Sequence, residues 1–403
     1  MFNLDGKQST ASMPLLVIPA LTILYLLLTS ILRTRHLHNL TKKYAHLTPN
    51  PYTMTPAQAH PILLSILTSE FPFSYAVSTQ FALLKSYAIP SGTSLLVATR
   101  RLTSPRTVAK RSEDTAIFIT ELLTSGLDTE RGLTALSKMN WIHRQYGARI
   151  TNDDMIHTFA LFVLEPLRWI ERFEWRPLLQ IERVAVFVYW REIALRMGMV
   201  GVPATIDELG VWVAEYEKTH MYFAESNVAC VEATLGLYVR FLPRALQGFG
   251  RWVGAALIEP RVRPLVGVAE PPRWVVGLVE GVLDVRAWAV RVLFLPRFRA
   301  LDAGGEVDVR TGRVRRKVYA FEPWYVGETW ALRVLKALGL GMAMGRPLPG
   351  PEYLSEGYLP EELGPKEFRE KSREDVLADA VKMREYALQG GGSTLGCPFA
   401  FGR

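Results

Sequence analysis

The stretch NWIHRQYGARITNDDMIHT, Asn140–Thr158, joins two segments with helical periodicity, 129–146 and 151–164. In both segments apolar residues recur every three or four positions, which is the spacing of one helix face. Gly147 is a residue type that commonly ends a helix, and Thr151 with an acid three residues later forms a variant of the N-terminal capping box. The stretch therefore predicts a helix, a tight turn and a second helix.

The same periodicity recurs along most of the chain, whereas the alternation typical of strands is rare. Helices are predicted in 59–99 (two or three), 113–124 and 205–242 (two, broken near 225–227). One short strand is predicted at 316–326. The tail beyond 345 is rich in Pro, Gly and charge, and is expected to wrap the surface without a core of its own. These patterns predict an all-α fold.

Composition excludes several classes of protein. The chain has 403 residues, 49% of them hydrophobic and 21% charged, which excludes wholesale disorder and a polytopic membrane protein. Its cysteines, Cys230 and Cys397, cannot build a disulfide framework. The net charge of +8 is spread out and comes without a nucleic-acid-binding module, so no nucleic-acid partner is expected.

Residues 13–32 (MPLLVIPALTILYLLLTSIL) are twenty residues without a charge, long enough to cross a bilayer as a helix. The basic residues Arg33, Arg35, Lys42 and Lys43 follow the segment, unlike the basic start of a signal peptide. Positive charge on this side predicts a single-pass anchor with the body of the protein in the cytosol.

A second apolar stretch, 274–295, carries four charges: Glu280, Asp284, Arg286 and Arg291. Charges in the middle of a segment are costly in lipid. A buried or interfacial amphipathic helix is therefore predicted here instead of a second span.

His143 and His157 lie on the predicted core-facing sides of the two helices in the opening stretch. Each is either a hydrogen-bonded core histidine or a ligand of a metal or haem, because imidazole is the commonest metal ligand. Asp154-x-x-His157 has no second copy, as a di-iron bundle would need, and His-Glu-x-x-His and Cys-x-x-Cys are absent from the sequence. The terminal GCPF around Cys397 is too close to the end of the sequence to be the cysteine loop of a haem-thiolate monooxygenase.

The chain resembles the fungal endoplasmic-reticulum-bound oxygenases of the mycophenolic-acid pathway type, which share a catalytic domain with bacterial rubber oxygenases (latex-clearing proteins). The resemblance rests on the order and spacing of several pieces. These are the N-terminal anchor, SYAVSTQFALLKSYAIPS (74–91), NWIHRQY (140–146), ITNDD (150–154), EPLRWIERFEWRPL (165–178), EYEKTHMYFAESN (215–227), LFLPRFRALD (293–302) and GCPF (396–399).

The resemblance implies a globin-like helical core that holds haem b through histidine. It also implies a reaction in which dioxygen cleaves a C=C bond of an isoprenoid or other apolar chain in secondary metabolism. The partners would be a prenylated apolar substrate, dioxygen and the bilayer of the endoplasmic reticulum. The protein would contribute the axial ligand, the polarity beside the iron and a dry pocket.

On this resemblance His143 is the predicted iron ligand and a catalytic residue, with Arg131 and Thr134 as catalytic partners. His157, His220 and Arg168 are predicted to bind the cofactor. Arg168 has an alternative role as the ion-pair partner of a neighbouring glutamate. The rival functions are a membrane-anchored helical binding protein that has lost the cofactor and a non-haem metalloenzyme.

The expected organisation has five parts. They are a lumenal N-terminus (1–12), a transmembrane anchor (13–32), a juxtamembrane linker (33–58), a helical haem-binding oxygenase domain (59–345) and an irregular C-terminal extension (346–403).

Overall fold

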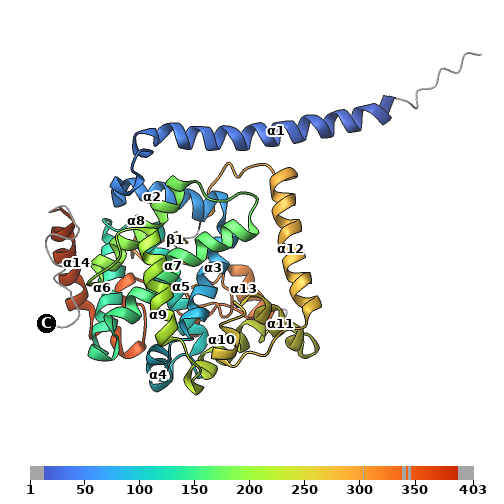
Figure 1. Ribbon diagram of the computed structural model, residues 1–403. Coiled ribbons are helices and arrows are strands. Elements are labelled where there is room, and N and C mark those ends of the chain that lie inside the picture. Colours follow the sequence, from blue (N-terminus) through green and yellow to red (C-terminus); the bar gives the residue numbers. More distant parts are fainter. Residues whose placement is uncertain (1–12, 303, 338–341, 344–345, 389–403) are drawn as a thin grey trace, which may run out of the picture.

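The computed structural model describes residues 13–302, 304–337, 342–343 and 346–388, and it confirms the all-α prediction (Figure 1). The α-helices are α1 (Met13–Lys43), α2 (Pro56–Ser65), α3 (Pro72–Ser86), α4 (Pro90–Thr99), α5 (Val108–Thr124), α6 (Glu130–Arg144), α7 (Asn152–Phe173), α8 (Gln180–Arg196), α9 (Ile206–His220), α10 (Glu225–Val239), α11 (Arg244–Leu257), α12 (Arg273–Val292), α13 (Trp330–Ala337) and α14 (Arg373–Leu388). A π-helical segment, Ile66–Glu70, follows α2. Short 3-10 turns lie at Ala45–Leu47, Pro51–Thr53, Gly147–Arg149, Arg263–Val266, Pro351–Tyr353, Pro360–Glu362 and Lys366–Phe368.

The main core lies between α2, α3, α5, α6, α7 and α8, where α3 packs along α7 and α2 along α8. Helix α7 is the longest of these, and it continues through Pro166 instead of ending near residue 164 as predicted. Its side chains Ile156, Ala160 and Val163 recur at helical spacing and are almost completely buried. A second apolar cluster joins α4 and α5 to α10 and to the segment after α11.

The described strands are only two residues long, and they pair as two antiparallel ribbons. In the first, β1 (Glu306–Val307) pairs with β2 (Val314–Arg315), and in the second, β3 (Met342–Ala343) pairs with β4 (Arg346–Pro347). The strand predicted at 316–326 is therefore wrong. This segment is irregular and contributes only a single bridge between its two end residues.

The C-terminal part contains a helix that the sequence patterns did not indicate. Helix α14 packs against α6, on the left-hand side of the molecule in Figure 1. Val376 and Met383 of α14 are fully buried. The prediction of an irregular extension without core contacts is wrong for this helix. The terminal GCPF with Cys397, like the predicted lumenal residues 1–12, lies outside the described residues.

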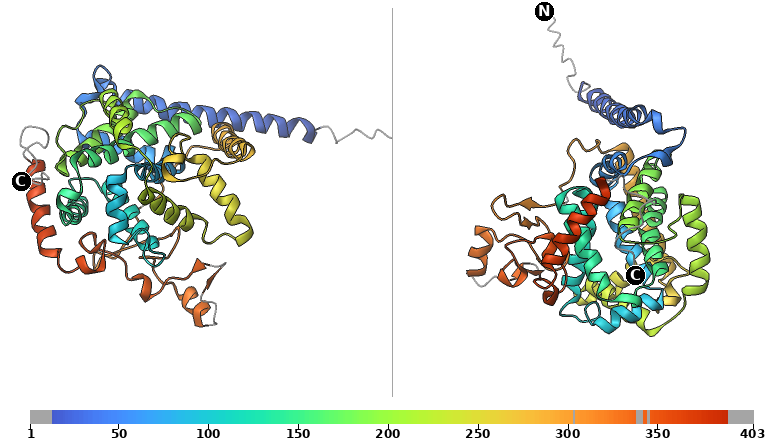
Figure 2. Two further views of the ribbon diagram at one scale, coloured as in Figure 1. Left: turned by 60° about the horizontal axis from the view of Figure 1, so that its bottom comes forward. Right: turned by 90° about the vertical axis from the view of Figure 1, so that its left-hand side faces the viewer.

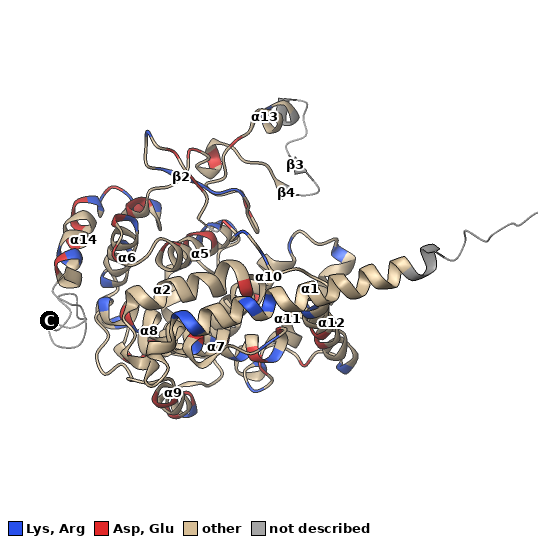
Figure 3. Cartoon of the chain, turned by 90° about the horizontal axis from the view of Figure 1, so that it is seen from above, with Lys and Arg blue, Asp and Glu red and all other residues tan. Residues whose placement is uncertain are grey.

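Helix α1 lies across the top of the body, and its N-terminal part projects beyond it (Figures 1 and 2). The helix over residues 17–43 is long and apolar enough to cross a membrane, and only 11% of its most apolar stretch of 18 residues is buried. In Figure 3 the described projecting part of α1 is tan, the colour of residues other than Lys, Arg, Asp and Glu. Of the described helices, α1 alone passes this test as a single straight segment.

Candidate haem pocket

A mostly apolar pocket lies between α4, α5, α6, α7 and α8. It contains about 1160 Å³ of empty space, part of which is open to solvent. Its walls are mostly aliphatic, aromatic and methionine side chains, including Phe162 and Trp190, whose rings stack 4.8 Å apart. His143 from α6 and His157 from α7 both line it. The structure thus brings the two histidines of the opening stretch into one apolar pocket.

His143 lies on the last turn of α6, and its Nδ1 is buried with no hydrogen-bond partner in the described part of the chain. Burial, followed by the positive charge of Arg111, lowers the pKa of His143 to about 4. The imidazole is therefore neutral at pH 7, which is the form that binds a metal. A buried polar atom without a hydrogen-bond partner carries a desolvation cost. A metal ion or cofactor bound in the pocket would give this nitrogen the partner that it lacks.

His157 differs from His143 because one of its ring nitrogens already has a partner. Its side chain is buried, and Nε2 donates to Glu217 Oε1 of α9 at 3.3 Å. Burial opposes ionisation of Glu217, but the hydrogen bond from His157 and the charges of Lys85 and Arg261 lower its pKa to about 2. Metal-binding histidines are commonly oriented by a carboxylate that accepts a hydrogen bond from the ring nitrogen not bound to the metal. Glu217 is such a carboxylate for His157, so His157 is a second candidate ligand through Nδ1.

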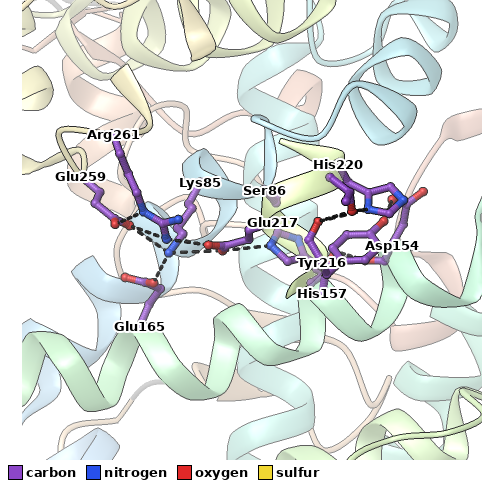
Figure 4. A network of polar contacts seen from close by, with 12 residues as sticks. Lys85, Ser86, Asp154, His157, Glu165, Tyr216, Glu217, His220, Glu259 and Arg261 are labelled. Carbon is purple, nitrogen blue, oxygen red and sulfur yellow. Dashed lines mark hydrogen bonds and ion pairs between the residues drawn. The ribbon is translucent and has the colours of Figure 1, made fainter. Parts of the chain in front are cut away.

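Glu217 belongs to an ionic network that extends from the pocket wall, where Lys85 and Glu217 are buried, to the more exposed Glu259 and Arg261 (Figure 4). Lys85 Nζ of α3 lies 3.0 Å from Glu165, 3.4 Å from Glu217 and 2.9 Å from Glu259. Arg261 pairs with both Glu217 and Glu259. Lys85, Glu165 and Glu259 also line a second pocket, bounded by α3, α7 and α12. The network therefore connects the wall of the histidine pocket to this second pocket.

Arg111 of α5 and Arg149 of the turn after α6 are the cationic side chains that line the histidine pocket. Arg111 donates to Thr115, one helical turn further along α5. Arg149 is exposed and lies at the rim. Neither arginine was predicted from the sequence, because both lie outside the core-facing stripes that the helical periodicity marks.

The other predicted site residues lie elsewhere. Arg131 lines a different pocket and pairs with Glu121, and the hydroxyl of Thr134 donates to the Glu130 carbonyl in its own helix. His220 is exposed at the end of α9 and stacks on Tyr216, 4.0 Å between ring centroids. The structure does not bring these three residues together with His143.

Arg168 lines the second pocket and pairs with Glu165 at 2.9 Å, which is the alternative role considered for it. The neighbouring arginines of this segment find partners further away. Arg172 pairs with Glu280 of α12, and Arg176 pairs with Glu182.

The predicted cap of α7 is confirmed, since Thr151 Oγ1 accepts from the Asp154 backbone N–H at 3.0 Å. The Asp154 carboxylate has a further role that the sequence did not indicate. It accepts from Tyr216 at 2.7 Å and from Ser91 at 2.8 Å, and so ties α7 to α9 and α4. Across the described residues, no three His, Cys, Asp or Glu side chains gather in a way that could hold a metal ion by themselves.

Comparison with known proteins identifies the family. Residues 97–292, from α4 to the end of α12, match the family described as "ER-bound oxygenase mpaB/B'/Rubber oxygenase, catalytic domain". The chain is 30% identical to ER-bound oxygenase mpaB of Penicillium roqueforti (strain FM164) over 258 residues, covering 60% of this chain and 87% of the relative. The chain belongs to the mpaB/rubber oxygenase family.

For another relative the similarity extends along almost the whole of both chains. This chain is 28% identical to ER-bound oxygenase mpaB' of Penicillium brevicompactum over 411 residues, which covers 97% of this chain and 95% of the relative. The region that matches the oxygenase catalytic domain contains both pocket histidines, Arg111 and Glu217. The predicted family assignment is thus confirmed. The matched region contains the pocket-lining residues of α5 to α8, while those between Ser86 and Leu96 precede it.

Proposed function

We propose that the protein is a membrane-anchored haem oxygenase that cleaves a C=C bond of an apolar, prenylated chain. The observation that carries the proposal is the apolar pocket into which His143 presents a neutral imidazole with an unpartnered buried nitrogen. Membership of an oxygenase family supports the reaction class, and the apolar walls support a hydrocarbon substrate.

The residues of the pocket fit haem b. His143 would hold the iron, and Arg111 and Arg149 would pair with the haem carboxylates or with polar groups beside the iron. The bound haem would supply the chemistry of dioxygen. Phe162, Trp190 and the methionines would exclude water and hold an apolar chain in the remaining space. In the overall reaction one dioxygen molecule supplies both carbonyl oxygens, so no external reductant is consumed.

Helix α1 supports the proposed location. It has the length and hydropathy of a membrane span, and its C-terminal part carries Arg33, Arg35, Lys42 and Lys43. This arrangement supports a single-pass anchor with a cytosolic body. The relatives named ER-bound oxygenases support the endoplasmic reticulum as the membrane. Extraction of microsomes with alkaline carbonate should leave the protein in the pellet, and external protease should digest the body. Full protection of the body inside sealed microsomes would reverse the orientation.

Spectroscopy tests the cofactor directly. The full chain, expressed with added haem precursor and purified in detergent, should show a Soret band and stoichiometric haem. A colourless protein with stoichiometric iron or zinc would favour a non-haem metalloenzyme. A colourless protein without metal would favour a helical binding protein that has lost the cofactor. Incubation of the coloured protein with prenylated metabolites under dioxygen should yield aldehyde or ketone products by mass spectrometry.

The two histidines can be ranked by substitution. His143→Ala should abolish haem retention, because it removes the neutral imidazole with the open nitrogen. His157→Ala should leave haem largely in place, because the neutral imidazole of His143 remains to hold the iron. The measurement is the ratio of Soret to protein absorbance, with circular dichroism as the control for folding. Loss of haem only in the His157 variant would make His157 the ligand.

A further inference from the structure

Helix α12 presents an apolar stripe that is largely exposed, and the first residue of the stripe, Trp274, contacts Phe249 and Trp252 of α11. Trp274, Leu278, Val282, Val285 and Trp288 follow one another at spacings of three or four residues, so they share one helix face. Each of them is between 46% and 64% exposed. The stripe continues into the segment after the helix, where Leu293, Phe294, Phe298 and Leu301 are also exposed. Contiguous exposed apolar surface of this kind marks a contact with a partner or a membrane.

The charged side chains of α12 are turned away from this stripe. Glu280 and Asp284 pair with Arg172 of α7 at 3.3 Å and 3.8 Å. Arg286 pairs with buried Glu174 at 3.0 Å. The acidic groups that made this segment too costly as a membrane span therefore pair with an arginine of the body on the side of the helix away from the stripe, and the stripe itself is left apolar.

The end of α12 is joined to the anchor. Tyr25 of α1 donates to the Leu293 carbonyl at 2.7 Å, and Arg33 donates to the carbonyls of Val290 and Phe294, both at 2.8 Å. Tyr25 lies seven residues before Leu32, the last residue of the predicted span, which is roughly 10 Å along the helix axis. If α1 crosses the bilayer, the end of α12 therefore lies at the depth of the lipid headgroups and the first acyl carbons.

The direction of α12 fits the same position. Figure 1 shows α12 running crosswise to α1, and in Figures 1 and 3 the anchor projects past α12 at that edge of the body. A helix crosswise to a membrane-spanning helix lies parallel to the membrane plane. Exposed Arg291 and Arg299 flank the apolar surface, as expected for contact with anionic headgroups.

We propose that α12 and the segment 293–301 form a lipid-docking surface that lies in the cytosolic interface of the membrane that α1 crosses. The occupant is an anionic phospholipid bilayer and not a protein partner, because the surface is continuous with the anchor and bordered by arginines. The proposal rests on the anchor described above. It holds the catalytic body against the membrane in one orientation, instead of leaving the body free on a tether.

Spin labels on the full chain test this surface. The background carries Cys397→Ser, while Cys230 is buried and is left in place. Single cysteines replace Val282 on the stripe, Leu24 in the anchor and Val309, which is 99% exposed between β1 and β2. Each labelled protein is reconstituted into vesicles of phosphatidylcholine and phosphatidylserine. Collision rates of the nitroxide with dioxygen, which concentrates in lipid, and with a nickel chelate, which stays in water, report its depth.

The label at 282 should collide mainly with dioxygen, as the label at 24 does, and the label at 309 mainly with nickel. Adding Val285→Asp and Trp288→Asp should move the label at 282 into water without moving the label at 24. If the label at 282 matches that at 309 while the label at 24 is in lipid, the docking surface is wrong and the anchor stands. If 24 and 282 are both in water, both proposals fail. Lipid contact at 282 alone would overturn the span, and the proposed position of the docking surface beside a membrane-crossing α1 would fail with it.

Discussion

At the scale of single residues, Arg111 lines the histidine pocket, whereas the resemblance predicts Arg131 as the catalytic arginine. The guanidinium of Arg111 also lowers the pKa of His143, and Arg131 is paired with Glu121 outside the pocket. Arg111→Met should therefore lower product formation per bound haem by at least about tenfold, the scale of losing one charged donor beside reacting groups.

Arg131→Met is the matched control for this prediction. It should lower the free energy of unfolding, because it leaves the buried Glu121 carboxylate without its ion pair, while turnover per bound haem changes little. Equal loss of turnover in the two variants would restore the catalytic role predicted for Arg131. Initial rates normalised to haem content make this comparison.

Glu217 gives a residue-scale prediction about pH. Its pKa in the folded protein, about 2, lies below its ordinary value of 4.5, so the carboxylate stabilises the fold above about pH 4.5. This contribution is lost as the pH falls from 4.5 towards 2. The free energy of unfolding of Glu217→Gln should be lower than that of the unsubstituted protein by on the order of 3 kcal/mol at pH 7.

The difference between the two proteins should shrink steadily between pH 4.5 and 2, as measured by urea unfolding at each pH. The ionic network around Lys85 is the reason, since protonated Glu217 no longer neutralises Lys85 and Arg261. A difference that stays constant over this range would mean that the Glu217 carboxylate is not held ionised by its partners.

At the scale of elements, the cap of α7 supports the helix that carries His157. Thr151→Ala removes the acceptor for the Asp154 N–H and should lower the free energy of unfolding by about 1 kcal/mol. The control is Thr120→Ala on α5, whose hydroxyl only bonds to a carbonyl one turn earlier in its own helix, so the change should stay within about 0.5 kcal/mol. Equal effects in urea unfolding would argue against the cap.

The elements also show what the sequence can reveal. Helices with a continuous apolar stripe, such as α6 and α7, are predictable because burial follows the helical period. Helix α14 was missed because nearly half of its sequence, REDVLADAVKMREYAL, is charged, and only a few of its side chains are buried. The strand prediction at 316–326 failed because its alternating apolar residues lie on an irregular segment and have no partner strand.

The same limit applies to the site. His143 and His157 could be assigned to core-facing positions from periodicity alone, and the structure places both on one pocket. Arg111 and Glu217 could not be found in this way. Their roles depend on how α5 and α9 pack against α6 and α7, and this distant packing leaves no mark in the local spacing of residues.

At the scale of the whole molecule, α14 braces the helix that bears His143. Arg144, next to His143, pairs with Asp379 of α14, and Met383 is fully buried between the helices. Met383→Ala should lower the free energy of unfolding by about 2–5 kcal/mol through the cavity it leaves. Val381→Ala, 58% exposed on the same helix, should change it by less than about 0.5 kcal/mol. Urea denaturation of both variants checks the difference, and similar values would show that α14 is not docked.

Trp141 of α6 is a fluorophore that lies close to both α14 and His143. Trp141 Nε1 donates to Asp375 of α14 at 3.0 Å, and Trp141 precedes His143 by only two residues. Tryptophan emits light at wavelengths that haem absorbs, so a haem held by His143 would quench the fluorescence of Trp141 by energy transfer. On the proposed function, tryptophan fluorescence would fall as haem enters, with Trp190 in the pocket wall also contributing, and the emission of Trp141 would shift to longer wavelength if α14 detached.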